Sequence, residues 1–302
     1  MSGDEDRRAR AARLLEEGIA RQHRADAAGA AESYEAAVGL APGLAAAWTN
    51  LGVARRKLGQ SRVAAACYRR ALALRPEDAA VWSNLGNAYR DEARLDAAEA
   101  AFREALRLDP DNTGFDYGLG LLLRDAGRLE EAVACHDRRL AAEPGDQQCR
   151  WDRALALLEM GRWAEGFAAY ESRWHIDQSP PWPGDLPAWD GRVMGKDEDL
   201  LLFTEQGFGD NIQFLRYIPA AAERAGRPVL LHCRPELMRL AAQVPGVAKV
   251  ISRDAPPPPA AAAQSLIGLP HALGLGPTDG QPAPYLSAEP ARVPPPLPGG
   301  PL

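Results

Sequence analysis

The residues best placed for chemistry lie in a glycine loop that follows an apolar run. Asp199-Leu-Leu-Leu-Phe203 indicates a buried strand, and Thr204-Glu-Gln-Gly-Phe-Gly-Asp210 comes directly after it. Glycines let backbone N–H groups approach a ligand, and the helix expected from Asn211 to about residue 225 adds a partial positive end. A carboxylate at Asp210 could act there as a general base that takes a proton from an acceptor hydroxyl. Asp210 could equally be the N-cap of that helix.

A second strand and helix come after the first pair. Pro228-Val-Leu-Leu-His-Cys233 indicates another buried strand, Pro235 to about Gln243 a helix, and Val247-Ala-Lys-Val-Ile251 a third strand. This alternation predicts a parallel sheet flanked by helices, that is, a partial α/β Rossmann-like domain. Ligands gather at the carboxyl ends of parallel strands, so residues 204–211 are expected at the mouth of any site.

No other group of residues suggests nucleophilic catalysis or metal binding. The histidines share no spacing with an obvious partner, and the cysteines are too few and too scattered for a disulfide framework or a zinc site. These residues are His23, His136, His175, His232 and His271, and Cys67, Cys135, Cys149 and Cys233. We expect the cysteines to be small buried residues and His136 to be a packed imidazole.

Charge and hydropathy exclude further classes of function. The net charge is -6 and the pI is about 5.5, so the composition does not indicate the clustered basic surface that binds a nucleic acid. No stretch approaches the 18 or so apolar residues that a membrane span needs, and the N-terminus has mixed charge without an apolar segment behind it. We therefore predict a cytoplasmic protein with no nucleic-acid partner and no membrane span.

The first half of the chain repeats with a period of 34 residues. Trp48, Leu51 and Gly52 follow the spacing of one helix face, so each period predicts a pair of helices. The repeated positions hold prolines (Pro42, Pro76, Pro110, Pro144), glycines (Gly18, Gly52, Gly86, Gly120), alanines (Ala30, Ala64, Ala98, Ala132) and rings (Tyr34, Tyr68, Phe102, His136, Tyr170). Gly59, Gly127 and Gly161 are expected in the turn between paired helices, where Ala93 stands in the third period.

These positions resemble the consensus of tetratricopeptide repeats, with about five repeats over residues 11–178. The resemblance implies an α-helical solenoid whose concave groove, lined by the first helix of each repeat, binds a protein or peptide. Asn50 and Asn84 share one repeat position, in the manner of the asparagine ladder of O-GlcNAc transferase repeats, and an amide can pair with both backbone groups of a peptide. Asparagine is also a common solvated residue there, so both interpretations stay open. The ladder position holds Gly118 and Asp152 in later repeats.

The segments outside the two predicted domains have unusual compositions. Residues 1–10 are expected to form an N-terminal tail. Prolines and tryptophans over residues 179–198 predict a stiff linker, in which Trp174, Trp182 and Trp189 pack the array against the second domain, with sugar stacking as the alternative.

Beyond residue 254, a high proline content favours extended, unpacked chain. Leu266–Leu273 is the one short packed segment expected there, and residues 294–302 are expected to form a proline-rich tail.

The stretch from Gly195 to about Ala291 resembles the heptosyltransferase-like (glycosyltransferase family 9) domain of bacterial tetratricopeptide proteins. The resemblance rests on Leu200-Leu-Leu-Phe-Thr-Glu-Gln-Gly-Phe-Gly-Asp-Asn-Ile-Gln-Phe-Leu-Arg-Tyr-Ile-Pro219 and on Ala283-Pro-Tyr-Leu286. It implies the N-terminal half of a GT-B fold over residues 199–293 and places Asp210 on the catalytic base of the family. Glu205, Gln206, Asn211 and Gln213 are then candidate acceptor contacts, and they could equally be solvated loop or helix residues. Gly207 and Gly209 would let backbone N–H groups face the substrate.

Two functions therefore stay open. The first is a tetratricopeptide interaction module, fused to a partial glycosyltransferase-like domain, that binds an extended peptide or a helix of a partner protein. The alternative is an inverting glycosyltransferase that moves a sugar from a nucleotide-sugar donor to a protein or glycan acceptor, with Asp210 as general base. The resemblance covers only the first half of that fold, so we expect the donor-binding half to be missing and the chain to bind partners without transferring sugar alone. No cofactor or metal is expected, since a nucleotide sugar would be a substrate.

Overall fold

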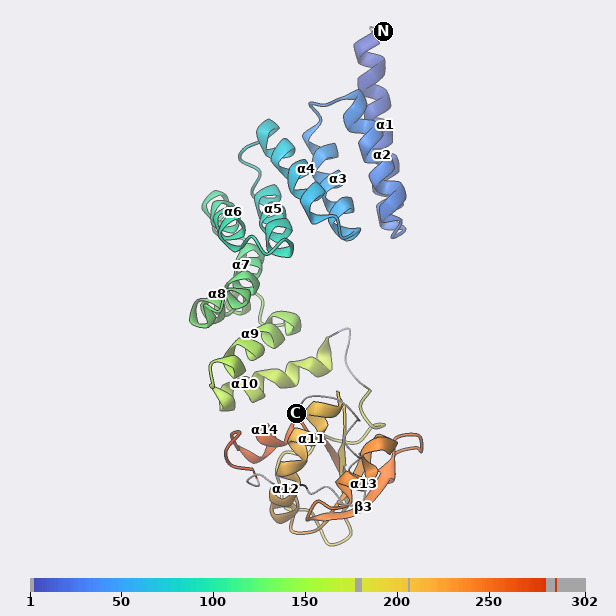
Figure 1. The fold of residues 1–302 in the computed structure, drawn as a ribbon, viewed down its shortest axis with the longest axis vertical. Helices are drawn as coiled ribbons and strands as arrows, with labels where there is room; N and C mark the ends of the chain where they lie inside the picture. The colour runs from blue at the N-terminus through green and yellow to red at the C-terminus, as the bar shows by residue number, and fades with distance from the viewer. Residues whose placement is uncertain (1–2, 177–180, 206, 281–285, 287–302) are drawn as a thin grey trace, which may run out of the picture. The chain divides into compact units, whose positions relative to one another are not determined.

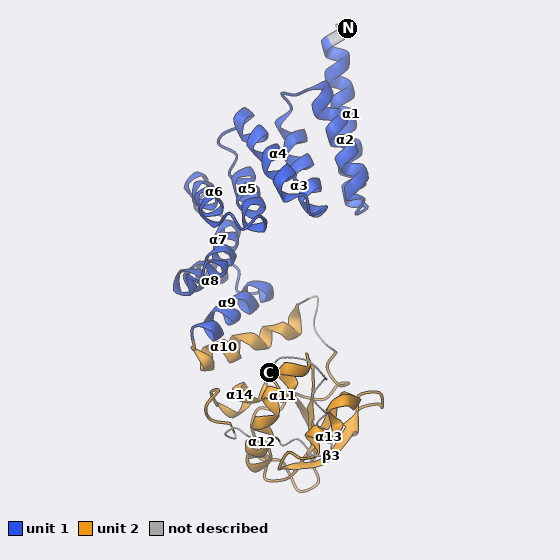
Figure 2. Ribbon diagram, in the orientation of Figure 1, with its two compact units in different colours: residues 1–160 blue, residues 161–302 orange. Residues whose placement is uncertain are grey.

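The computed structural model describes residues 3–176, 181–205, 207–280 and 286. The chain divides into two compact units, residues 1–160 and residues 161–302 (Figure 2). The first unit is helical, and the second combines a parallel sheet with helices.

Helices of the first unit alternate with short turns and pack in sequence order (Figure 1). They are α1 (Gly3–His23), α2 (Ala27–Leu40), α3 (Ala45–Lys57), α4 (Ser61–Leu74), α5 (Ala79–Asp91), α6 (Leu95–Leu108), α7 (Thr113–Asp125), α8 (Leu129–Ala142) and α9 (Gln147–Glu159). The predicted helix pairs are confirmed for the first four repeats, from α1 and α2 to α7 and α8. Residues 3–10, expected as a tail, instead form the first turns of α1, where Asp4, Glu5 and Asp6 favour the positive end of the helix.

The repeated glycines are required because each faces a ring of the paired helix. A Cβ atom added at Gly52 would lie 2.5 Å from the Tyr68 ring, and one added at Gly120 would lie 2.7 Å from the His136 ring. Real side chains do not approach so closely, so the two helices of a repeat pack at this distance only with glycine. This explains why the glycine and ring positions share one period.

Tryptophan and proline share the period for a related reason. The indole Nε1 of Trp48 donates to the carbonyl of Pro42 at 2.9 Å, and that of Trp82 donates to the carbonyl of Pro76 at 2.8 Å. Each tryptophan thereby satisfies a carbonyl of the loop that connects one repeat to the next.

The turn positions have the predicted left-handed backbone. Gly59 and Gly127 both have a φ of 73°, and Ala93 takes the same conformation with a φ of 56°. A left-handed conformation costs an alanine about 1 kcal/mol. The third repeat, through Ala93, and the first repeat, through Ala25 with a φ of 59°, therefore hold a small backbone strain that the glycine turns avoid.

The second unit is built on a four-stranded parallel sheet. Its strands are β1 (Leu200–Phe203), β2 (Val229–Cys233), β3 (Val247–Ser252) and β4 (Ala262–Ser265), in the order β3-β2-β1-β4. The helices are α10 (Trp163–Tyr170), α11 (Phe208–Phe214), α12 (Ile218–Ala225), α13 (Met238–Ala241) and α14 (Leu269–Leu273), with 3-10 turns η1 (Glu171–His175), η2 (Leu215–Tyr217) and η3 (Pro235–Leu237). The predicted parallel sheet is confirmed.

Two expectations about this unit are wrong. The chain after residue 254 is not unpacked throughout, because β4 pairs with β1 and is fully buried. The segment expected as a linker also belongs to the unit, since the backbone N–H of Trp189 donates to the carbonyl of Ala263 and the Trp189 ring lies in the main core. Residues 294–302 lie outside the described residues.

Candidate functional site

The first helices of the repeats form one continuous face. α3 contacts α5, α5 contacts α7, and α7 contacts α9, and Figure 1 shows them on one side of the array with α4, α6 and α8 on the other. We call this surface the first-helix face. Asn50 on α3 and Asn84 on α5 are both half-buried, and neither amide hydrogen-bonds to another described residue. Their donors and acceptors remain available to a ligand.

The asparagine position changes in the next two repeats for steric and electrostatic reasons. A Cβ atom at Gly118 would lie 2.5 Å from the ring of Phe102, so no side chain fits there. Asp152 is buried and accepts a hydrogen bond from the Tyr117 hydroxyl at 2.7 Å, while Arg124 lies 3.7 Å from its other oxygen. The two free amides are therefore confined to α3 and α5.

Ion pairs between neighbouring repeats follow the same period. Arg56 of α3 binds Asp91 of α5 through two hydrogen bonds, at 2.7 and 3.2 Å. Arg90 lies 3.6 Å from Asp125, and Arg124 lies 4.0 Å from Glu159. Sequence reasoning missed this set, although its arginines and its acids each recur one period apart and could have revealed it. Each arginine has an acidic partner, so the set contributes no net charge to the face.

The buried histidine and cysteines of the array are packing residues. His136 has no exposed surface and lies against Tyr117, with ring centroids 5.8 Å apart. Burial lowers its pKa to about 4, which keeps the imidazole neutral. Cys149 is buried beside it, where burial raises the pKa of the thiol to about 12 and leaves it unreactive. The predictions of a packed imidazole and of buried cysteines are confirmed.

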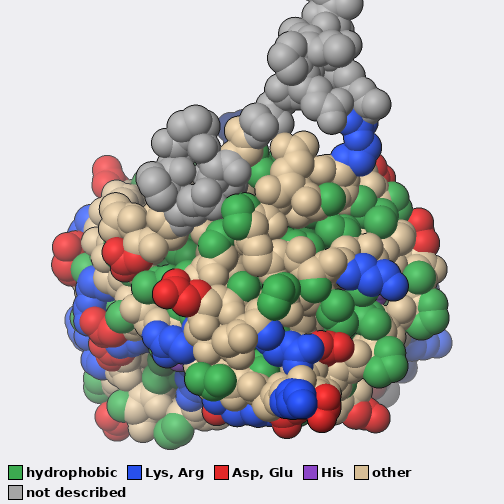
Figure 3. Space-filling model, turned by 90° about the horizontal axis from the view of Figure 1, so that it is seen from below, with side chains coloured by type: hydrophobic (Ala, Val, Ile, Leu, Met, Phe, Trp, Pro, Cys, Tyr) green, Lys and Arg blue, Asp and Glu red, His purple; other side chains and the backbone are tan. Residues whose placement is uncertain are grey.

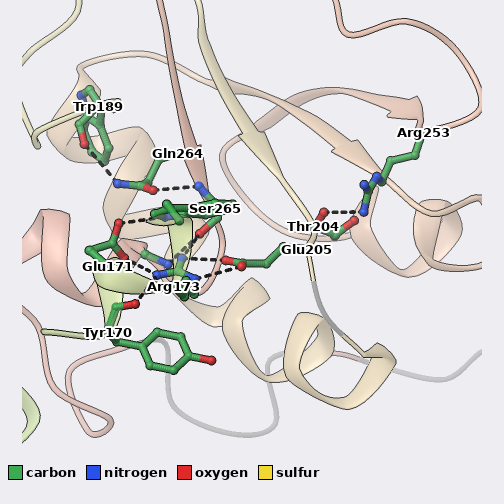
Figure 4. A network of polar contacts seen from close by, with 11 residues as sticks. Tyr170, Glu171, Arg173, Trp189, Thr204, Glu205, Arg253, Gln264 and Ser265 are labelled. Atoms are coloured by element: carbon green, nitrogen blue, oxygen red, sulfur yellow. Dashed lines mark hydrogen bonds and ion pairs between the residues drawn. The ribbon is translucent and has the colours of Figure 1, made fainter. Parts of the chain in front are cut away.

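In the second unit, a buried ion pair fills part of the carboxyl edge of the sheet. Arg173 of η1 donates to Glu205, just beyond β1, through Nε at 2.9 Å and Nη2 at 2.8 Å. It also donates to Ser265 at the end of β4 and to Glu171, and Figure 4 shows these side chains directed toward it. Its guanidinium lies 4.4 Å from the Trp174 ring. Glu205, one of the predicted substrate contacts, is thus paired with a residue of the chain itself.

The structure brings the other predicted residues of the loop together at the start of α11. Asp210 is exposed in the first turn of this helix. The N-cap is Gly207, so the alternative that Asp210 caps the helix is wrong; α11 begins earlier than the sequence suggested. A Cβ atom at Gly209 would meet no other group within 4 Å, so the fold itself does not require glycine there.

Two further predicted contacts differ in exposure. Asn211 is buried and its amide donates to the carbonyl of Gly207 at 2.8 Å, which holds the loop, whereas Gln213 is exposed. Gln206 lies outside the described residues. The assignment of these residues to a substrate stays a prediction.

Two of the tryptophans expected near the domain boundary, Trp174 and Trp182, pack together on β1. The rings of Trp174 and Trp182 meet edge to face with centroids 4.9 Å apart, and both contact Phe203. Trp189 is 2% exposed. Trp189 is therefore a core residue, while Trp174 and Trp182 are half-buried and sugar stacking on them stays a prediction.

Other kinds of site find little support in the described part of the chain. No group of three His, Cys, Asp or Glu side chains in residues 3–176, 181–205 and 207–280 could hold a metal ion. Across these same residues, no helix is both long and apolar enough to cross a lipid bilayer. On the face drawn in Figure 3, basic, acidic and apolar side chains are interspersed, without a large region of one sign among the described residues.

Comparison with known proteins identifies the repeats. Residues 49–113 and residues 89–158 match two family models, each described as tetratricopeptide repeat. The search of curated proteins gave no match.

Solved structures that are similar to the chain include MamA (21% identity, 51% of this chain and 91% of that one, TM-score 0.47). PilF of Pseudomonas aeruginosa (20% identity, 57% and 77%, TM-score 0.49) and a thermophilic TPR protein of Thermus thermophilus (22% identity, 58% and 93%, TM-score 0.48) are also similar.

Proposed function

We propose that the tetratricopeptide repeats bind an extended segment of a partner protein on the first-helix face. The observation that carries this function is the pair of free amides, Asn50 and Asn84, at one repeat position on neighbouring helices. An amide donates to a peptide carbonyl and accepts from a peptide N–H, so each asparagine suits the backbone of an extended chain. Neighbouring packed helices lie about 8–10 Å apart, which an extended chain spans in about three residues.

The ion pairs of this face indicate how the partner is recognised. The charges of Arg56, Arg90 and Arg124 are opposed by carboxylates of the same face. A partner rich in one sign of charge would therefore gain little long-range attraction. We expect recognition through backbone hydrogen bonds, with affinity that depends weakly on salt.

Replacing both asparagines with alanine is expected to weaken the binding of a peptide selected on this protein from a library of unstructured peptides. Each lost amide contact is worth about 1 kcal/mol, so each single change should reduce affinity about 5-fold. Isothermal titration of the wild type, Asn50→Ala, Asn84→Ala and the double variant measures this.

Asn87→Ala is the matched control, because Asn87 lies one turn further along α5 and its amide already donates to the carbonyl of Ser83. Its affinity should stay within about 2-fold of wild type. Equal affinities of the double variant and the wild type would rule out the proposed role of the two amides.

A second candidate function is sugar transfer by the parallel-sheet unit, with Asp210 as general base. The observation that favours it is the exposed carboxylate of Asp210, on the helix that follows β1 and beside a glycine that the fold does not require. The strand order β3-β2-β1-β4 also suits a Rossmann-like half-domain. We propose that this unit presents an acceptor hydroxyl to Asp210 and that a donor-binding lobe must be supplied before transfer occurs.

This candidate predicts that residues 1–302 alone do not turn over a nucleotide sugar. A donor that is not held near the acceptor loses the rate advantage of proximity, which is on the order of 7 kcal/mol. Mass spectrometry of reactions with a panel of nucleotide sugars tests this. Turnover by the isolated chain that Asp210→Asn abolishes would contradict the requirement for another lobe, and turnover that survives Asp210→Asn would remove Asp210 as the base.

A further inference from the structure

We propose that the carboxyl ends of β1, β2 and β3 form a binding site for the phosphate group of a small soluble ligand, held by Arg234 and Arg253. This inference goes beyond the peptide-binding function and does not depend on it. It rests on the register of the strands, the direction of the two side chains and the absence of carboxylate partners for them among the described residues.

The register places the two arginines next to each other. β2 and β3 are parallel, and Cys233 pairs with Ser252 at their carboxyl ends. Arg234 and Arg253 are the next residue on each strand, and the backbone N–H of Arg253 donates to the carbonyl of Cys233 at 2.8 Å. Neighbouring strands lie about 4.8 Å apart, so the two side chains begin side by side.

Both side chains extend toward the loop that follows β1. Nη1 of Arg253 donates to the backbone carbonyl of Thr204 at 2.8 Å, and Figure 4 shows it pointing at that residue. The guanidinium carbon of Arg234 lies 5.2 Å from the centre of the Phe208 ring. Thr204 lies at the start of the glycine loop and Phe208 at its end. The guanidinium groups of Arg234 and Arg253 therefore both contact this loop, each from a different one of two neighbouring strands.

Neither arginine is neutralised by the described residues. Arg192 and Arg227 of the same unit pair with Glu198 and Asp199. Arg234 and Arg253 have no carboxylate of the described chain within 4.0 Å, although the exposed carboxylates of Asp210, Glu236 and Asp254 are close in sequence to the loop or to these arginines. Adjacent positive charges without a partner repel each other, and a bound anion would relieve this repulsion.

A third donor lies beside the arginines. Thr204 is 1% exposed, and its hydroxyl has no hydrogen-bond partner among the described residues. Buried hydroxyls nearly always have a partner, and the described residues supply none to this one. On the other side of β1, the ion pair of Arg173 and Glu205 already fills the edge. The two arginines lie at the other part of the edge, beyond β2 and β3, which this ion pair does not occupy.

This donor set suits a phosphate group. Guanidinium groups bind phosphate oxygens through paired, charge-assisted hydrogen bonds, and a hydroxyl can donate a further one. The ring of Phe208 is 42% exposed beside Arg234 and offers an apolar surface to the rest of such a ligand. The ligand class is therefore a phosphate ester or diphosphate with an apolar or ring-shaped portion.

Isothermal titration of residues 1–302 with inorganic pyrophosphate tests the proposal. Saturable binding is expected, and Arg234→Gln together with Arg253→Gln should weaken it at least 10-fold. Arg234→Gln alone should weaken it several-fold, and this variant is expected to fold because Arg234 makes no hydrogen bond or ion pair to a described residue. Arg192→Gln is the matched control, since Arg192 is an exposed arginine of the same unit that pairs with Glu198; its affinity should not change.

Three results would overturn the proposal. One is the absence of saturable binding by the wild type at low salt. Another is unchanged affinity in a folded Arg234→Gln variant, with folding checked by circular dichroism. The third is binding to vesicles that contain phosphatidic acid without binding to pyrophosphate, which would assign the arginines to a membrane surface instead of a small ligand.

Discussion

Arg173→Met is expected to destabilise the parallel-sheet unit by about 3–5 kcal/mol, because it leaves the Glu205 carboxylate buried without a counter-charge. The side chains of Arg173 and Glu205 are 2% and 0% exposed, so water cannot replace the lost partner. The variant also removes the hydrogen bond to Ser265 and the contact with the Trp174 ring. Urea unfolding followed by tryptophan fluorescence measures the change, since Trp174 packs on β1.

Two further variants distinguish the effect of the unpaired buried carboxylate from a nonspecific loss of stability. Combining Arg173→Met with Glu205→Gln removes both charges, and much of the stability should return because no carboxylate remains unpaired. Arg192→Met breaks an exposed pair with Glu198 and should leave the free energy of unfolding close to that of the wild type. A loss below about 1 kcal/mol for Arg173→Met itself would show that the pair does not hold the sheet edge.

The repeat array could be predicted closely because its signals are local and recur. The period of glycine, ring and proline follows from contacts inside one helix pair, such as Gly52 against Tyr68. Arg56, Arg90 and Arg124 recur in the same way. Their role, however, depends on acidic partners that lie 35 residues later in the sequence, on the first helix of the next repeat. It could be found only by asking which residues of neighbouring repeats face each other.

The second unit was harder to predict because its key contacts join distant segments. β4 consists of Ala262-Ala-Gln-Ser265, which has no β-branched residue, and it becomes a strand through pairing with β1. The partners Arg173 and Glu205 are 32 residues apart, with no repeated pattern to relate them. The same limit applies to Arg234 and Arg253, which become neighbours only through the register of β2 and β3.

Phe102→Ala is expected to destabilise the repeat array by about 3–5 kcal/mol. The ring has no exposed surface, and it lies against both Gly86 on α5 and Gly118 on α7. It therefore fills the space between two repeats, and alanine would leave a cavity lined by backbone that cannot collapse. Urea unfolding monitored by circular dichroism, together with hydrogen exchange of α5 and α7, measures the loss.

The loss of stability in Phe102→Ala should at first be confined to the helices around residue 102. The reason is that the stability of a repeat array is approximately a sum over the repeats and their interfaces. Amides of α5, α6 and α7 should exchange faster in Phe102→Ala, while those of α1 and α2 should keep wild-type rates under native conditions. Val63→Ala is the control on α4, since Val63 is 46% exposed and its loss should change stability by no more than about 0.5 kcal/mol. If Phe102→Ala and Val63→Ala unfolded at the same urea concentration, the ring would not join the two repeats.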